Sequence, residues 1–244
     1  MQVALLTVGD EILAGDIENT NATWLARQLT ERGVTVTRIL TVPDDRAVIA
    51  GTLSDWTDQF DAVVVTGGLG GTPDDVTMDA VADAVGAEMA VNDEAREDVE
   101  ATIAAYREQY PDLTERYPDL DLDVTQHASI PGGARPLLNT VGLSPGCVID
   151  DVYVFPGIPE EMKAMFDAVA EEFGGSVVSE LLYTDAPEGA LTEQLRTVRE
   201  RFGVAVGSYP SRGEPNRLKV VGEDAGSVAE ATAWLRDHVE TVDR

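Results

Sequence analysis

Residues 61–77 read DAVVVTGGLGGTPDDVT, and this stretch decides the expected fold. The run from Ala62 to Val65 is short, continuously apolar and rich in β-branched residues, which is typical of a strand buried on both faces of a parallel sheet. Helical spacing of apolar residues begins after Thr77, so we expect a strand, a turn and a helix. The intervening loop is rich in glycine and contains Gly67, Gly68, Gly70 and Gly71.

This loop has the composition of a phosphate-binding turn. Glycine lets backbone N–H groups face a ligand without obstruction, and the helix that follows adds the positive end of its dipole. Asp74 and Asp75 carry the wrong charge for phosphate alone, so the loop fits a phosphate bridged to a divalent cation. The alternative is an ordinary turn before a helix with an acidic first turn, which the helix dipole also favours. Both interpretations stay open for each Asp.

The chain is strongly acidic. Its 244 residues include 45 Asp and Glu but only 17 Lys and Arg, which gives a formal net charge of −28. Such a surface repels a phosphate backbone, so nucleic acid is not an expected partner. The acidic residues are dispersed, and the lysines are Lys163 and Lys219 alone. This composition predicts a halophilic protein, soluble in a cytoplasm of high salt where screening weakens self-repulsion.

The cysteine content and the apolar runs bear on location. The single cysteine, Cys147, allows no internal disulfide and fits a reducing compartment. Its apolar neighbours predict a buried packing residue and not a nucleophile. The N-terminal apolar stretch is too short for a signal peptide or a membrane span. We therefore expect a cytoplasmic protein with no membrane partner.

Strands and helices are predicted to alternate along most of the chain. The predicted strands cover residues 3–8, 34–42, 62–65 and 148–155, and residues 128–134 and 137–142 are expected to form edge strands and turns. The predicted helices cover residues 23–33, 44–56, 77–85, 92–110 and 160–173. Regular alternation implies right-handed crossovers and a parallel sheet with helices on both faces. The fold class is therefore α/β.

Gly174 and Gly175 mark the best boundary in the chain. Residues 1–173 form the α/β domain, and residues 175–244 are expected to form a small β-α-β-β-α subdomain. The predicted elements of the subdomain are 177–183, 191–202, 204–208, 218–221 and 228–239. A unit of this size is only marginally stable by itself.

Ligands of an open parallel sheet bind beyond the carboxyl ends of the strands. The loops expected there are 9–13, 67–75 and 156–160. Their acidic residues, which we expect at one crevice, are Asp10, Glu11, Asp74, Asp75 and Glu160. Carboxylate oxygens suit magnesium or manganese.

Other site classes are disfavoured by what the motifs lack. His127 and His238 are expected away from the crevice, so a zinc site with nitrogen and sulfur ligands is not predicted. No Walker-type lysine follows the glycines, which argues against ordinary nucleotide triphosphatase chemistry. No Gly-x-Gly-x-x-Gly motif follows a strand, which argues against a dinucleotide oxidoreductase.

Four motifs resemble the molybdopterin-binding fold family. They are TVGDEILAGDIENTN at 7–21, TGGLGGTPDDVT at 66–77, NTVGLSPG at 139–146 and PGIPEEM at 156–162. They are most similar to the N-terminal part of the competence-damage-inducible protein CinA and to its stand-alone archaeal relatives. Similar modules occur in MogA, MoaB and MoeA and in the hydrolase-like domain of FAD synthase.

The resemblance covers residues 1 to about 173, and residues 175–244 resemble the smaller subdomain that follows in CinA. It implies a parallel three-layer α/β/α sandwich with a small C-terminal α+β subdomain. Because the chain ends before the amidase domain of CinA, it also implies no nicotinamide-nucleotide amidase activity. Gly71 replaces a proline that is usual in the family loop, so we expect weaker preorganisation of that loop with intact chemistry.

The resemblance implies two different functions. CinA-type domains are similar to metal-dependent pyrophosphatases that split ADP-ribose or FAD at the diphosphate, whereas the MogA branch adenylates molybdopterin. We expect the pyrophosphatase, in which a metal-activated water attacks one phosphorus. The alternative is a molybdopterin-binding or nucleotide-binding protein, or an adenylyltransferase, without hydrolase activity. The implied cofactor is Mg, Mn or Co, and a dimer or trimer is expected.

The resemblance assigns roles to particular positions. Asp75 is the first catalytic candidate and Asp10 the second. The candidate metal ligands are Asp75, Asp10, Asp74 and Glu11, and the candidate ligand-binding residues are Gly67, Gly68, Gly70, Thr72, Asn19, Asn21 and Gly157. For Asn19 and Asn21, capping of a helix is an alternative of equal weight to ligand contact. For Glu160, the alternative is that it is only an acidic residue in the first turn of a helix.

Overall fold

The computed structural model describes residues 1–112, 116–117, 123–211 and 213–243. The chain divides into two compact units, Met1–Gly174 and Gly175–Arg244. The first unit contains β1 (Gln2–Val8), α1 (Asp10–Leu13), α2 (Thr20–Glu31), β2 (Thr35–Val42), α3 (Arg46–Thr57), β3 (Ala62–Thr66), α4 (Thr77–Val85), β4 (Met89–Val91), α5 (Asp93–Gln109), α7 (Val124–His127), β5 (Ser129–Pro131), β6 (Arg135–Leu137), β7 (Gly146–Ile149), β8 (Val152–Phe155), α8 (Pro159–Val169) and a 3-10 turn (Ala170–Glu172).

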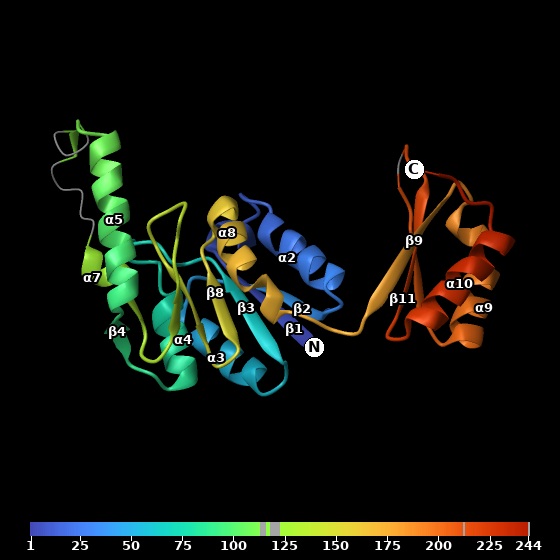
Figure 1. Ribbon diagram of the computed structural model, residues 1–244, viewed down its shortest axis with the longest axis horizontal. Coiled ribbons are helices and arrows are strands. Elements are labelled where there is room, and N and C mark those ends of the chain that lie inside the picture. The colour runs from blue at the N-terminus through green and yellow to red at the C-terminus, as the bar shows by residue number, and fades with distance from the viewer. Residues whose placement is uncertain (113–115, 118–122, 212, 244) are drawn as a thin grey trace. The chain divides into compact units, whose positions relative to one another are not determined.

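A six-stranded sheet with the order β2-β1-β3-β8-β7-β6 forms the centre of the first unit (Figure 1). The strands β2, β1, β3 and β8 are parallel, with Leu5 opposite Val64 and Val64 opposite Tyr153. The strands β7 and β6 continue the sheet in antiparallel pairing. The predicted α/β class is confirmed, and the sheet is mainly rather than wholly parallel.

Each face of this sheet is covered by a different pair of helices. Leu5 and Val64 pack with residues of α2 and α8, whereas the neighbouring Leu6 and Val65 pack with residues of α3 and α4. Side chains alternate between the two faces of a strand, so a strand buried on both faces is apolar throughout. The three-layer α/β/α sandwich is therefore confirmed.

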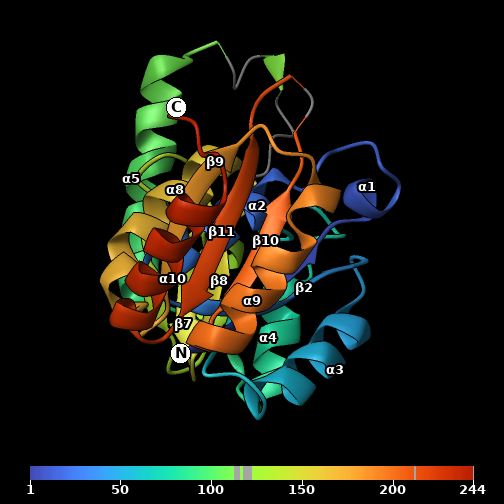
Figure 2. The ribbon, with the colours of Figure 1, turned by 90° about the vertical axis from the view of Figure 1, so that its right-hand side faces the viewer.

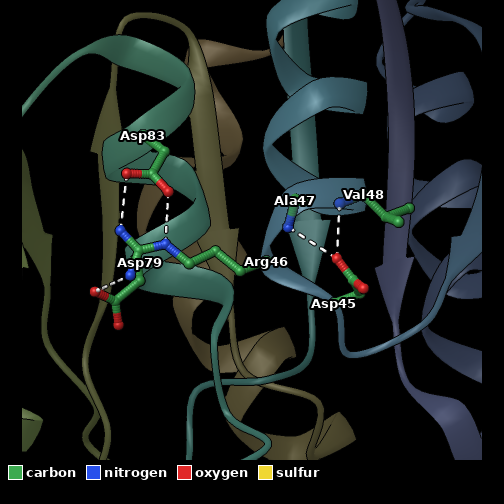
Figure 3. Close-up of polar contacts among 6 residues, drawn as sticks. All are labelled: Asp45, Arg46, Ala47, Val48, Asp79 and Asp83. Atoms are coloured by element: carbon green, nitrogen blue, oxygen red, sulfur yellow. Dashed lines mark hydrogen bonds and ion pairs between the residues drawn. The ribbon is translucent and has the colours of Figure 1, made fainter.

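A salt-bridge cluster joins the two helices of one face. Asp45 is the N-cap of α3, and its Oδ1 accepts hydrogen bonds from the N–H groups of Ala47 and Val48 (Figure 3). The Arg46 guanidinium lies between two carboxylates of α4, with Nη2 2.8 Å from Asp83 Oδ1 and Nη1 3.2 Å from Asp79 Oδ1. This contact fixes the start of α3 against α4, the helix that follows the glycine loop.

One predicted strand of the first unit is wrong, and one observed strand was not predicted. The strand expected at 148–155 is a hairpin of β7 and β8, whose turn residues Asp150 and Asp151 have φ of 44° and 61°. A two-residue turn with both φ values positive usually contains glycine or asparagine, so two aspartates gave no turn signal. The edge strands and turns expected at 128–134 and 137–142 correspond to β5 and to β6, which ends at Leu137. The short strand β4, paired with β5, was not predicted.

The second unit has the predicted order β-α-β-β-α. It contains β9 (Val178–Thr184), a 3-10 turn (Glu188–Ala190), α9 (Thr192–Phe202), β10 (Ala205–Tyr209), β11 (Asn216–Gly222) and α10 (Ala225–His238). Its strands form an antiparallel sheet with the order β10-β11-β9. Both helices cover one face of this sheet and share an apolar core with it (Figure 2).

Cys147 is fully buried in β7, and burial raises the pKa of its thiol to about 12. This confirms the prediction of a packing residue, since a protonated and inaccessible thiol is a poor nucleophile. Within the described part of the chain, no helix combines the length and apolar character needed to cross a membrane.

Candidate functional site

A pocket of about 790 Å³ lies at the carboxyl ends of the parallel strands. Its walls include residues of the three loops expected to meet there, at 9–12, 67–75 and 156–159. The predicted convergence of these loops is therefore confirmed. Side chains from the segment after β2, from α7 and from the loop before β7 complete the wall.

The glycine loop, residues 67–75, lines this pocket with unused backbone donors. The N–H of Gly67 donates to the carbonyl of Phe155 at 3.1 Å, which anchors the start of the loop to β8. Within the described residues, the N–H groups of Gly68, Gly70 and Gly71 donate no hydrogen bond. Several unpaired N–H groups in one concave turn form a binding site for anions such as phosphate.

Two of these glycines have no possible substitute. Gly67 has φ of +101°, and a Cβ there would lie 2.3 Å from the carbonyl oxygen of Val8. Gly68 has φ of +67°, and a Cβ there would lie 2.3 Å from Thr77 Oγ1. Both the backbone conformation and the close approach require glycine. The loop therefore passes close to β1 and α4 and keeps its backbone facing the pocket.

Asp75 lines the pocket and also shapes the loop. Its Oδ2 accepts hydrogen bonds from Thr72 N at 2.9 Å and Thr72 Oγ1 at 2.6 Å. Its Oδ1 accepts no hydrogen bond within the described residues. Asp74, Thr72 and Gly70 line the pocket as well. The Thr72 hydroxyl thus donates to Asp75, and a hydrogen bond from the Thr72 side chain also lowers the pKa of Asp74.

Asp44, which lies at the start of the helix predicted at 44–56, is part of the pocket wall. Its neighbour Asp45 is the N-cap of α3. Asp44 Oδ2 accepts the N–H of Asp10 at 2.8 Å, and the lining residues include Glu11 but not Asp10. Burial, together with the nearby charges of Glu11, Asp10 and Asp74, raises the pKa of Asp44 despite the hydrogen bond from Asp10. The site therefore concentrates negative charge on this side.

Asn19 and Asn21 have different roles. Asn19 Oδ1 accepts the N–H of Ala22 at 3.0 Å, so Asn19 is the N-cap of α2. Asn21 Nδ2 donates to the carbonyl of Gly157 at 2.7 Å and ties α2 to the loop before α8. Asn21 Oδ1 is buried in the pocket wall without a hydrogen-bond partner among the described residues, and so is Thr66 Oγ1. Buried polar atoms without partners usually mark a ligand or water position.

His127 lines the pocket, so the expectation that it lies elsewhere is wrong. Its Nδ1 lies 3.0 Å from Ser144 Oγ. A Cβ at Gly71 would lie 3.1 Å from His127 Nε2, so the imidazole occupies the space beside that glycine. Burial lowers the pKa of His127, although Asp123 and Asp75 oppose this shift. The neutral ring connects α7 to the glycine loop, a contact that depends on long-range folding and leaves no local sequence signal.

The asparagine loop, residues 139–146, contributes Leu143 and Ser144 to the pocket wall. Asn139 Nδ2 donates to Glu161 Oε2 at 2.6 Å and to the carbonyl of Ser144 at 2.9 Å. Glu161 lines the pocket, and the predicted neighbour Glu160 does not. Burial raises the pKa of Glu161, partly offset by the hydrogen bond from Asn139. This side chain therefore supports the loop.

The carboxylates of the pocket fit a cation that is also bound by phosphate oxygens of a substrate. Among the described residues, no group of three His, Cys, Asp or Glu side chains is arranged to hold a metal ion. Magnesium is commonly held by one or two carboxylates together with substrate phosphate oxygens and water. The carboxylates of Glu11, Asp44, Asp74 and Asp75 line the pocket with the free N–H groups of the glycine loop. The structure therefore fits a bridged cation and not a preformed cage.

The chain belongs to the family described as the probable molybdopterin binding domain, whose model matches residues 4–174. Residues 176–242 match the model described as the middle domain of FAD synthase. These two matches correspond to the two units of the structure. The family assignment confirms the resemblance drawn from the four motifs.

Relatives align with most of the chain. A protein of Archaeoglobus fulgidus is 34% identical over 239 residues, covering 97% of each chain. A CinA-like protein of Parasynechococcus marenigrum is 34% identical over 251 residues, covering 98% of this chain and 57% of its own length. The crystal structure of CinA from Thermoplasma acidophilum superposes with a TM-score of 0.59 and 31% identity, covering 70% of this chain and 97% of that one.

Proposed function

We propose that the protein is a metal-dependent pyrophosphatase that splits a nucleotide diphosphate of the ADP-ribose or FAD type. The observation that supports this proposal is that free N–H groups of the glycine loop line the same pocket as the carboxylates of Glu11, Asp44, Asp74 and Asp75. A diphosphate needs both donors for its oxygens and a cation to neutralise its charge. The match of the second unit to a domain of FAD synthase agrees with a nucleotide ligand.

Each residue has a defined task in this proposal. The N–H groups of Gly68, Gly70 and Gly71 bind phosphate oxygens, and Asn21 Oδ1 accepts a hydrogen bond from the nucleoside. Asp75 Oδ1, which accepts no hydrogen bond among the described residues, accepts one from the attacking water and orients it. Asp75, Asp74, Asp44 and Glu11 would hold Mg, Mn or Co. When bound, the cation neutralises charge on the diphosphate.

The experiment is a product analysis. Purified protein is incubated with ADP-ribose, FAD and related diphosphate nucleotides, with Mg, Mn or Co in turn, in molar KCl that suits the predicted high-salt cytoplasm. Chromatography should show mononucleotide products that vanish after chelation of the metal. No turnover with any nucleotide and metal in this panel contradicts the proposal.

The second candidate is binding or adenylyl transfer without hydrolysis, and the name of the matched family favours it. A binding protein would keep its affinity for a pterin or a nucleotide after chelation. An adenylyltransferase would form an adenylated pterin from ATP. Calorimetric titration and chromatography of the same preparation distinguish these outcomes from diphosphate cleavage.

We also propose a homo-oligomer, a dimer or a trimer. The edge strand β2 exposes Ile39 and Leu40 to 51% and 40%, and both lie on a strand whose outer edge is unpaired in the described structure. Free sheet edges and exposed apolar side chains favour pairing with another chain. Light scattering in molar salt should therefore report a mass above that of a monomer, and a monomer alone contradicts this proposal.

A further inference from the structure

A second hollow, of about 420 Å³, adjoins the main pocket between the first turns of α2 and α8. The two hollows share part of their walls, namely Glu18, Asn19, Thr20, Asn21 and Pro159, so they lie side by side. The rest of the wall of the second hollow is formed by Thr23, Trp24, Arg27 and Lys163. None of these residues was among the predicted site residues.

The two cations of this hollow have no acidic partner. Within the part of the chain that the structure describes, neither Arg27 nor Lys163 forms an ion pair or donates a hydrogen bond. Lys163 is one of two lysines in a chain with 45 acidic residues, and its Nζ lies 5.9 Å from the Trp24 ring centroid. Trp24 itself packs edge-to-face on Phe166 at 5.4 Å. An aromatic ring thus positions the ammonium group without neutralising it.

The backbone adds positive potential at the same place. Helix α2 begins at Thr20 and α8 at Pro159, and both residues line the second hollow. No side chain caps α8, and within the described residues the N–H groups of Glu160 and Glu161 have no acceptor. Helix N-termini with free N–H groups attract anions. Glu18 supplies the acidic side chain of this wall.

An independent observation points to a ligand that reaches both hollows. Asn21 is 8% exposed, and its Oδ1 lacks a hydrogen-bond donor within the described residues. It stands where the two hollows meet, because it lines both. A ligand that extends from the glycine loop past Asn21 would supply the missing donor and place its next group between Arg27 and Lys163.

We infer that the second hollow binds a phosphate monoester of the same ligand whose diphosphate lies on the glycine loop. The inference rests on the proposed function for the position of the diphosphate. Two cations against one acid, with the uncapped N-terminus of α8, suit a dianion, whereas the carboxylates that line the main pocket repel one. The protein therefore selects diphosphate nucleotides that carry an additional phosphate.

Two pairs of nucleotides test this selectivity, because the members of each pair differ only by one phosphate monoester: NADP with NAD, and coenzyme A with dephospho-coenzyme A. Dissociation constants are measured by calorimetry with magnesium, in the Asp75→Asn background to prevent turnover. The phosphorylated member should bind at least about tenfold more tightly, as expected for charge-assisted hydrogen bonds. Equal affinity within both pairs overturns the inference.

Variants of the two cationic residues show where the additional phosphate binds. Lys163→Gln and Arg27→Gln should each remove most of the preference, and Lys163→Arg should retain it. Lys219→Gln, which changes the lysine of the second unit, is the matched control and should bind as the parent does. Thermal unfolding verifies that each variant is folded. A preference that survives both Lys163→Gln and Arg27→Gln assigns the extra phosphate to another place and overturns the inference.

These outcomes are separate from those of the proposed function. Because affinity is measured without turnover, a preference that depends on Lys163 stands even if the wild-type protein hydrolyses none of the nucleotides. Conversely, hydrolysis of ADP-ribose without any preference within the two pairs supports the pyrophosphatase and rejects the phosphate subsite.

Discussion

The glycine loop and the asparagine loop line the same pocket but are held in opposite ways. In the glycine loop, the N–H groups of Gly68, Gly70 and Gly71 have no acceptor among the described residues. In the asparagine loop, both polar atoms of one side chain are satisfied: Asn139 Oδ1 accepts the N–H groups of Val141 and Gly142, and Nδ2 donates twice.

This difference separates a binding element from a supporting one. Gly70 and Gly71 are exposed and Gly68 is half-buried, so their free N–H groups are accessible to a ligand that enters the pocket. A loop closed on its own asparagine is complete and gives the pocket a fixed wall. Changes in the glycine loop should therefore affect ligands and turnover, and changes in the asparagine loop should affect folding stability.

The largest expected effect is on the supporting loop. Asn139→Ala leaves the Glu161 carboxylate, the Ser144 carbonyl and the N–H of Gly142 without their partner. We expect a loss of about 2–4 kcal/mol in the free energy of unfolding of the first unit, because several buried polar groups become unsatisfied together. Urea unfolding followed by tryptophan fluorescence measures it. Thr140→Ala, which changes an exposed neighbour, is the control. A loss below about 1 kcal/mol for Asn139→Ala contradicts the supporting role of the asparagine loop.

The next effect is on the binding loop. Asp75→Asn removes a charge but keeps an oxygen that can accept from Thr72, so the loop should persist. We expect turnover of the hydrolysed nucleotide to fall about a hundredfold, on the scale of one lost electrostatic stabiliser, with the midpoint of thermal unfolding almost unchanged. Glu160→Gln, an acid outside the pocket wall, should leave turnover intact. Near wild-type turnover in Asp75→Asn would remove Asp75 from the chemistry.

A smaller effect concerns the contact of His127 with the glycine loop. A Cβ at Gly71 would lie 3.1 Å from Nε2 and 3.2 Å from Cε1, so Gly71→Ala should push the ring outward. Since burial lowers the pKa of His127, the displaced ring should titrate at higher pH. NMR titration of the His127 imidazole in the wild type and in Gly71→Ala measures this shift. An unaltered His127 titration in Gly71→Ala contradicts the described contact.

The smallest effect is a pH dependence at Asp44. Its folded pKa is raised, so the stability that the proton contributes is present at acid pH and is lost as the pH rises through the folded value. Asp44→Asn should thus stabilise the apo protein at pH 7 by up to about 0.5 kcal/mol, and less at pH 4. Asp45→Asn, which keeps a capping residue on α3, is the control. The stabilisation by Asp44→Asn is measured from the midpoints of urea unfolding at pH 7 and pH 4. A larger stabilisation at pH 4 than at pH 7 contradicts the expected pH dependence.

The sequence predicted the parts of the site that local patterns determine. The apolar run of β3 and its glycines indicated a buried strand and a backbone-lined turn, and sheet topology then placed the three loops at one crevice. The sequence could not show which neighbouring side chain enters the pocket. Glu161 and not Glu160 lines it, and Asp44 lines it where Asp10 does not. These choices depend on the angle at which each helix meets the sheet.

The same limit explains His127. Its ring reaches the pocket because α7 and β5 bring residues distant in sequence beside the glycine loop, and no periodicity reports such a contact. The β7–β8 hairpin was missed for a different reason. Its turn uses Asp150 and Asp151 where asparagine and glycine would have given the usual signal.

That hairpin turn ties the antiparallel end of the sheet to ionic strength. Two adjacent aspartates at the tip of the turn repel each other, and both hold left-handed backbone conformations that aspartate tolerates but does not favour. Dissolved salt weakens the repulsion within a few ångströms at molar concentration, since the screening length is then about 3 Å. Dilution would restore it and loosen the β7–β8 connection first. When salt is removed, the sheet should therefore begin to open at the turn formed by Asp150 and Asp151.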